Sequence, residues 1–213
     1  MPELKGWTIS VENGGGTLSS GNKFIVFGKR AYAKDHTEGW YRIDISQTFH
    51  GQAEDVATVT VPRFMSAADL VHREVKNGGV VTMHCANGNS RTSFVLIVYL
   101  MRHEGFTWDE ASQLISDGQT ERPDIVFNIN AGGHNGPYST WVKEYSQNGK
   151  LMDRADSSYY IETFSQVRCE PKENKAVFEI MKTHRPKKMR AGEQERIDVF
   201  DGALGLLALG ATQ

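Results

Sequence analysis

The chain has 213 residues, of which 24 are Lys or Arg and 26 are Asp or Glu, and its formal net charge is −2. This balance excludes a general electrostatic attraction to nucleic acid. Two cysteines exclude a disulfide scaffold and favour a reducing location, either the cytosol, the nucleus or the interior of a virion. We find no apolar run of membrane-spanning length and expect no signal peptide at residues 1–5.

The first third of the chain predicts strands after a loop. Residues 1–21 are rich in Gly and Ser and are expected to form a flexible N-terminal segment. Residues 23–28 and 40–45 are predicted as strands, and residues 56–61 are β-prone as well.

A helix and a buried strand are predicted next. Ser66 is followed three positions later by Asp69, the spacing of a capping box that starts a helix. The glycines at 78–79 are expected to end this helix. Residues 80–83 are short, apolar and largely β-branched, which indicates a buried strand.

The following segments predict more helices. Residues 94–101 are too densely apolar for an exposed helix, so we expect a central buried helix there. Thr107 and Glu110 form a second capping-box pattern. Strands and helices in this order predict an α/β fold with a central sheet flanked by helices.

The most specific pattern lies between the strand at 80–83 and the helix at 94–101. It reads His84, Cys85, Ala86, Asn87, Gly88, Asn89, Ser90, Arg91 and Thr92. A loop between a strand end and a helix N-terminus points backbone N–H groups and the helix dipole at one place, where an anion binds. Cysteine attacks phosphorus as the thiolate, which the same groups stabilise.

Each position in this loop has an expected role. Cys85 is the candidate nucleophile, and Arg91 has a planar fork suited to two phosphate oxygens. The backbone of residues 86–90 is expected to bind the phosphate, with Gly88 giving the conformational freedom of a tight cradle. The Thr92 hydroxyl is placed to donate to the sulfur when it leaves phosphorus in the second step of a ping-pong reaction.

This loop resembles the signature of the cysteine-dependent protein tyrosine phosphatase superfamily, specifically of its dual-specificity branch. Flanking segments are similar too: residues 63–71, residues 95–101, Arg122 with Pro123, and residues 135–138 with Trp141, Val142 and Tyr145. The resemblance covers about residues 56–145. It implies hydrolysis of a phosphoprotein monoester through a phosphocysteine, without a cofactor or metal.

The same resemblance implies a general acid, usually an Asp about thirty residues before the cysteine. Asp55 lies 30 positions before Cys85 and is our candidate. If residues 40–45 are the strand before the acid loop, Asp55 lies in that loop. If residues 56–61 are that strand instead, Asp55 lies before the strand rather than after it. The acid loop would then be residues 62–64, which contain no carboxylate.

Asp55 is interpreted equally well as an ordinary turn residue. Three other carboxylates are alternative candidates for the general acid. These alternatives are Glu54, Asp117 and Asp124. Without any acid, good leaving groups such as aryl phosphates would be favoured.

His84 is a supporting residue rather than a base in this interpretation. Adjacent residues of a strand point in opposite directions, so we expect His84 to hydrogen-bond the backbone and tune Cys85. The remaining histidines lack metal-ligand spacing. Cys169 lacks a partner motif, and a redox-controlled disulfide between it and Cys85 is a hypothesis only.

The sequence divides into the N-terminal segment, a catalytic domain at residues 22–148 and a C-terminal extension at residues 149–213. Within the extension, residues 176–183 predict a short amphipathic helix, and residues 200–211 are mostly small and apolar. The basic cluster at 182–190 is read as a solvated linker, with docking of an acidic partner or RNA as the alternative.

We predict a protein phosphatase of the dual-specificity or tyrosine type. Superfamily members that resemble phosphoinositide phosphatases typically carry basic residues inside the loop. This loop has none, so the resemblance disfavours an inositol lipid substrate. Ser90-Arg91-Thr92 shares its last two residues with the loop of RNA 5′-triphosphatases of the superfamily, the enzymatic alternative. The non-enzymatic alternative is a phosphate-binding interaction module.

Overall fold

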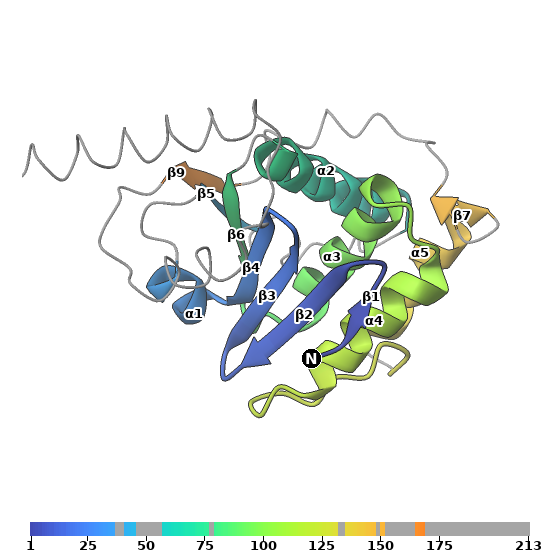
Figure 1. Cartoon of the computed structure of the whole chain (residues 1–213). Helices are drawn as coiled ribbons and strands as arrows, with labels where there is room; N and C mark the ends of the chain where they lie inside the picture. The colour runs from blue at the N-terminus through green and yellow to red at the C-terminus, as the bar shows by residue number, and fades with distance from the viewer. Residues whose placement is uncertain are drawn as a thin grey trace, which may run out of the picture.

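The computed structural model contains a seven-stranded mixed sheet packed against helices (Figure 1). The strand order is β1-β2-β3-β4-β6-β5-β9. The structure describes residues 1–36, 41–45, 57–76, 79–131, 135–147, 150–151 and 165–168. The α/β class with a central sheet and flanking helices is as expected from the sequence.

The N-terminal residues form strands rather than the expected flexible segment. They contribute β1 (Glu3–Leu4), β2 (Trp7–Glu12) and β3 (Gly15–Ser20), which pair antiparallel with one another and with β4 (Lys23–Lys29). The loop prediction for residues 1–21 is therefore wrong. Glycine serves close packing here, because a Cβ on Gly15 or Gly16 would overlap neighbouring strand backbone.

The parallel part of the sheet positions the loop. β6 (Val80–Cys85) lies between β4 and β5 (Tyr41–Asp44) and is parallel to both, while β9 (Ser165–Arg168) pairs antiparallel with β5 at the edge. The strands predicted at 23–28, 40–45 and 80–83 are thus confirmed within the described residues. Parallel alignment brings the carboxyl ends of β4, β5 and β6 to one edge of the sheet.

The segment at 56–61 is helical where the structure describes it, because α2 spans Ala57–Lys76. The strand prediction for this segment is therefore wrong. All its residues except Ala57 are β-branched. Val61 is nevertheless fully buried in the helix, as are Phe64 and Met65 one turn on, and such tertiary packing overrides a weak local preference. Pro62 lies inside α2, where a proline cannot donate a backbone hydrogen bond.

Ser66 does not start this helix, contrary to the capping-box prediction. It lies in the middle of α2, and its Oγ donates to the carbonyl of Pro62 over 2.9 Å, the back-bond of a mid-helix serine. The helix ends at Lys76, and the backbone N–H of Gly79 donates to Glu74 O over 3.0 Å. The predicted stop near residues 78–79 is confirmed.

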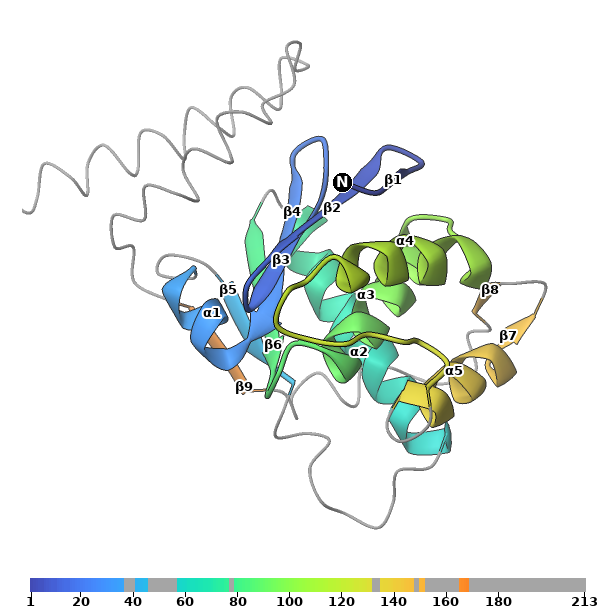
Figure 2. The same cartoon turned by 90° about the horizontal axis from the view of Figure 1, so that it is seen from below.

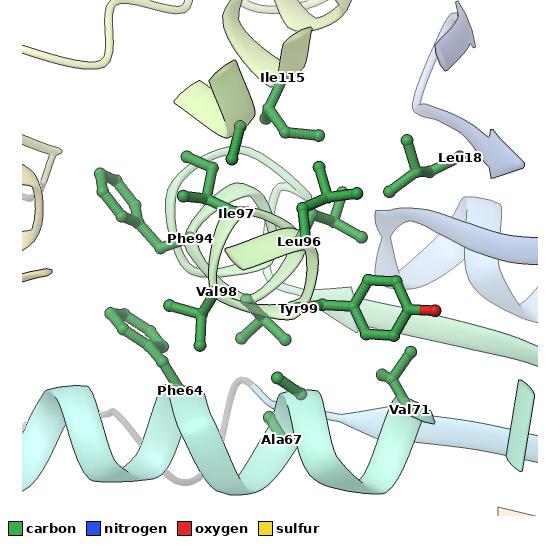
Figure 3. Packing of buried hydrophobic residues seen from close by; sticks show 14 of the residues in the cluster. Leu18, Phe64, Ala67, Val71, Phe94, Leu96, Ile97, Val98, Tyr99 and Ile115 are labelled. Carbon is green, nitrogen blue, oxygen red and sulfur yellow. The ribbon is translucent and has the colours of Figure 1, made fainter. Parts of the chain in front are cut away.

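The helix after the loop is central and buried, as predicted. α3 spans Ser90–His103, and every residue from Thr92 to Met101 is buried. Figure 3 shows α3 along its axis, with Phe64, Ala67 and Val71 of α2 on one side and Ile115 on the other. A helix buried all round is held rigidly, so its N-terminus is a fixed platform for the loop.

Two further helices cover α3 (Figure 2). α4 (Trp108–Thr120) begins with the predicted capping box: Glu110 N–H donates to Thr107 Oγ1 over 3.3 Å, and Thr107 N–H donates to Glu110 Oε2 over 2.8 Å. α5 (Asn135–Glu144) is the closing helix that the resemblance implied.

Short elements complete the described chain: α1 (Arg30–Asp35), β7 (Ser146–Gln147) and β8 (Lys150–Leu151). Within the described ranges, no helix is both long and apolar enough to cross a bilayer. The segments at 176–183, 182–190 and 200–211 lie outside those ranges, so the predictions for them stay predictions.

Candidate active site

Cys85 is the last residue of β6, at the edge where the parallel strands end. Its Cα is paired in register with that of Lys29, and His84 is paired with Asp44 on the other side. The thiol is free, and the residue is 2% exposed. The carboxyl edge of a parallel sheet is where α/β proteins place their ligands.

The chain after Cys85 turns sharply against β4. Gly88 has a φ of +60°, and a Cβ at this position would overlap the backbone of Gly28. Lys29 makes an isolated β-bridge with Asn87. Glycine is therefore required at position 88 both by its conformation and by the close approach of two backbones.

Two buried side chains bind the outer side of the loop. Arg122 donates to Gly88 O from Nη1 over 2.6 Å and to Asn87 O from Nη2 over 3.4 Å. Gln119 also donates to Gly88 O, from Nε2 over 3.1 Å. The carbonyl of Asn89 is bound as well, by the backbone N–H and the hydroxyl of Ser93.

These contacts fix the direction of the loop amides. In a planar trans peptide, the C=O of one residue and the N–H of the next point in opposite directions. With the carbonyls of residues 87–89 held outward, the N–H groups of Gly88, Asn89 and Ser90 face the other side. Together with the N-terminus of α3, they form a cradle suited to a phosphoryl group.

Thr92 lies in the first turn of α3 and contacts Cys85, the candidate nucleophile. Its Oγ1 donates to Cys85 Sγ over 3.1 Å, and both side chains are buried. The hydrogen bond that the sequence predicted is present, and its role in the second step of the reaction stays a prediction. Arg91 precedes Thr92 in the first turn of α3 and is partly exposed.

His84 is buried beside Asp44, with its Nδ1 3.7 Å from Asp44 Oδ1. Burial is the main reason why the pKa of His84 lies below its usual value. The nearby Asp44 carboxylate raises this pKa, whereas Arg42 and Arg30 lower it. The imidazole is therefore neutral near pH 7 and suits a supporting role rather than a permanent ion pair.

Asp44 is a neighbour of the site that sequence reasoning missed. Its Oδ2 accepts a hydrogen bond from Arg30 Nη2 over 3.1 Å, and it ends β5 in register with His84. An acidic residue closing a strand that runs parallel to the nucleophile strand was the available signal. Gln119 and the loop contacts of Arg122 were also missed, because they depend on how α4 returns to the loop.

The alternative general acids differ in their surroundings. Asp124 accepts two hydrogen bonds from Arg122, over 3.1 and 2.8 Å. Burial raises the pKa of Asp124, but the hydrogen bond from Arg122, the Gly14 N–H and the charge of Arg122 together bring it below its ordinary value. A carboxylate held ionised is a poor proton donor.

Asp117 is exposed on α4, where Oδ1 accepts from Gln113 over 2.6 Å. Asp55 and Glu54 lie outside the described residues, as does Cys169. The geometry thus disfavours Asp124 and leaves Asp55 as a prediction.

Comparison with known proteins gives one family. Residues 30–133 match the model of the dual specificity phosphatase catalytic domain. The chain is 35% identical over 88 residues to mouse dual specificity phosphatase 28, covering 36% of this chain and 54% of that protein. It is 37% identical over 65 residues to mouse dual specificity protein phosphatase 26, covering 30% and 31%.

The matched segments thus span about half and about a third of these two relatives. The crystal structure of human DUSP28 aligns with 68% of this chain and 95% of its own, at 17% identity and a TM-score of 0.42. The family match at residues 30–133 contains the whole Cys85–Arg91 loop, so over this segment the chain is similar to the dual specificity phosphatase catalytic domain.

Proposed function

We propose that the protein hydrolyses phosphomonoesters of phosphoproteins through a phosphocysteine at Cys85. One observation carries this proposal: the sulfur ends β6 inside a loop whose carbonyls are bound from outside, and it accepts a hydrogen bond from Thr92 at the start of α3. A buried cysteine with only a structural role does not need a neighbouring loop whose carbonyls are hydrogen-bonded from outside. It also does not need a hydroxyl group that donates a hydrogen bond to its sulfur.

The reaction has two displacements at phosphorus. In the first, the Cys85 thiolate forms an S–P bond while the P–O bond to the substrate breaks, and Asp55 gives its proton to the departing oxygen. In the second, water forms a new P–O bond as the S–P bond breaks, and the Asp55 carboxylate takes the proton from water. Arg91 and the loop amides stabilise the equatorial oxygens in both transition states.

Family similarity and loop composition support a phosphoprotein substrate. Dual-specificity phosphatases act on phosphoproteins, and residues 86–90 contain no Lys, Arg or His that would suit a polyanionic inositol headgroup. A catalytic thiolate also requires a reducing compartment, such as the cytosol, the nucleus or a virion interior.

The test is p-nitrophenyl phosphate hydrolysis against pH for wild type, Cys85→Ser and Asp55→Asn. We expect no turnover by Cys85→Ser and loss of the alkaline limb of the profile in Asp55→Asn, since that limb reports the general acid. Asp109→Asn is the control, because Asp109 is an exposed carboxylate in the first turn of α4.

Phosphate release from phosphotyrosyl and phosphoseryl peptides and from triphosphate-ended RNA then defines the substrate. Release from the peptides supports the proposal. Release from RNA alone would replace the protein substrate with the RNA 5′-triphosphatase alternative. No wild-type turnover on any substrate, with phosphate binding retained, would leave a phosphate-binding module.

A further inference from the structure

We propose that Arg122 is a positioning residue for the reaction: it sets the direction of the phosphate-binding amides from the outer side of the loop without touching the substrate. This inference rests on the proposed function insofar as the loop binds the substrate phosphate. It concerns a side chain 37 positions beyond Cys85 in the chain.

The guanidinium is buried, and each of its nitrogens has an acceptor. The side chain of Arg122 is 0% exposed. Nη1 donates to Gly88 O and, over 3.2 Å, to Gln119 Oε1; Nη2 donates to Asn87 O and Asp124 Oδ2; Nε donates to Asp124 Oδ1. Burying an arginine is costly unless all its donors are paired, so this geometry is tightly specified.

The acceptors of this guanidinium are of two kinds. Two are loop carbonyls, which turn the N–H groups of Gly88 and Asn89 to the opposite, phosphate side. The others are side-chain oxygens: Gln119 Oε1 and the Asp124 carboxylate, which neutralises the charge on the outer side. Arg122 therefore orients the amides while its own charge is largely compensated there.

Asp124 connects Arg122 to the N-terminal hairpin that β2 and β3 form. Gly14, in the turn between β2 and β3, hydrogen-bonds Asp124 through its N–H, and its carbonyl accepts from Lys29 N–H over 2.8 Å. Lys29 Nζ lies 3.9 Å from Asp124 Oδ2. The segment after α4 passes this hairpin in both views (Figures 1 and 2), so the hairpin backs the loop through Asp124 and Arg122.

A lysine cannot reproduce these contacts. Its single ammonium keeps the charge but cannot span two loop carbonyls and bind a carboxylate side-on. Arg122→Lys thus separates charge from loop geometry, and Arg122→Met removes both while keeping most of the side-chain volume.

A matched control exists at the other end of α3. Arg102 makes the same side-on contact with a carboxylate, Asp69, over 2.6 and 3.2 Å, and its side chain is 18% exposed. Arg102→Met therefore removes a comparable ion pair far from the loop. It reports the effect of lost stability alone.

The experiment measures kcat and KM for p-nitrophenyl phosphate, inhibition by tungstate, and alkylation of Cys85 by iodoacetate and by iodoacetamide. Iodoacetate carries an anion that the cradle attracts, whereas neutral iodoacetamide reports the thiolate alone. We expect Arg122→Met and Arg122→Lys each to lose about 10- to 100-fold in kcat/KM, as for loss of charge-assisted hydrogen bonds. Tungstate inhibition and the iodoacetate-to-iodoacetamide ratio should fall with them.

Arg102→Met should keep the wild-type iodoacetate-to-iodoacetamide alkylation ratio and the wild-type inhibition by tungstate. This should hold even if urea unfolding shows that the variant is less stable. The inference is overturned if Arg122→Lys matches wild type in kcat/KM and in the alkylation ratio. It is also overturned if kcat/KM and the alkylation ratio fall as much in Arg102→Met as in the Arg122 variants, since the loss would then come from lower stability. An inactive wild type that still binds tungstate would refute the proposed function, while the alkylation ratio would still test Arg122.

Discussion

Thr92 Oγ1 donates a hydrogen bond to Cys85 Sγ over 3.1 Å, and the two buried side chains thereby connect the end of β6 to the first turn of α3. A hydroxyl that donates to sulfur stabilises the thiolate more than the neutral thiol. In the proposed reaction, the same hydrogen bond stabilises the sulfur as a leaving group when phosphocysteine is hydrolysed.

Replacing Thr92 with Val should therefore slow the second step more than the first. We expect kcat to fall about 10-fold, the scale of one hydrogen bond to a charged group, with a pre-steady-state burst of p-nitrophenol. Rapid-mixing kinetics provides the measurement, and Thr92→Ser should restore kcat because it keeps the hydroxyl. A Val variant with wild-type kcat and no burst would contradict this role.

Gly88→Ala should damage the loop beyond the ordinary cost of a left-handed backbone. Gly88 has a φ of +60° and no room for a Cβ beside Gly28, whereas Gly105 has a φ of +71° with nothing within 4 Å of its Cβ position. We expect Gly105→Ala to lower the free energy of unfolding by about 1 kcal/mol.

Gly88→Ala should cost at least about 2 kcal/mol, because overpacking adds to the same conformational penalty. Urea unfolding of both variants measures the difference. Equal losses would mean that the Gly28 backbone moves aside without penalty.

The nucleophile loop was predictable from sequence because its chemistry is local. Cys85, Gly88 and Thr92 lie within eight consecutive residues, and strand, turn and helix follow directly from their order. The buried α3 was equally predictable, since its apolar density leaves no polar face. The Thr107 capping box was also correct, whereas Ser66 and Asp69, with the same spacing, lie in the middle of α2, so this spacing does not locate a cap by itself.

The errors came from contacts distant in sequence. Val61 prefers strands by itself, yet it packs in α2 against the core. Gly15 and Gly16 read as a flexible loop, yet they allow β3 to lie close to its neighbours. For the same reason the contact of Arg122 with Gly88, 34 positions apart, had no sequence signal beyond the Arg-Pro resemblance.

Phe94→Ala should strongly destabilise the protein, because Phe94 joins α3 to three other aromatic side chains. Its ring centroid lies 6.0 Å from that of Phe64, 5.5 Å from Tyr138 and 6.4 Å from Trp108. Removing a buried Phe costs about 3–5 kcal/mol, and Phe94→Leu should cost less than half of that loss. Urea denaturation is the measurement, with Val126→Ala as control because Val126 is 93% exposed. A Phe94→Ala loss similar to that control would show that the cluster does not hold α3.

Acidification should destabilise the fold through two imidazoles, that of the buried His84 and that of the partly buried His72. Burial lowers the pKa of His84, and burial with the nearby His103 lowers that of His72. Below the pKa of an unfolded imidazole, near 6.5, the unfolded chain therefore binds more protons than the folded one, and the free energy of unfolding falls as pH falls. This contribution is present above pH 6.5 and is lost as pH drops through that value toward the folded-state pKa.

Urea unfolding at pH 7.5, 6.5 and 5.5 measures this slope. His84→Gln should flatten it in part, and His72→Gln should flatten it further, since both groups act in the same direction. The lowered pKa values of Asp124 and Glu110 act below the range of this experiment, because unfolded carboxyl groups titrate near pH 4. A double variant with the wild-type slope would show that other groups carry the acid sensitivity. A flattened slope together with unchanged turnover at pH 7.5 would assign His84 to the stability of the β6 end rather than to proton transfer.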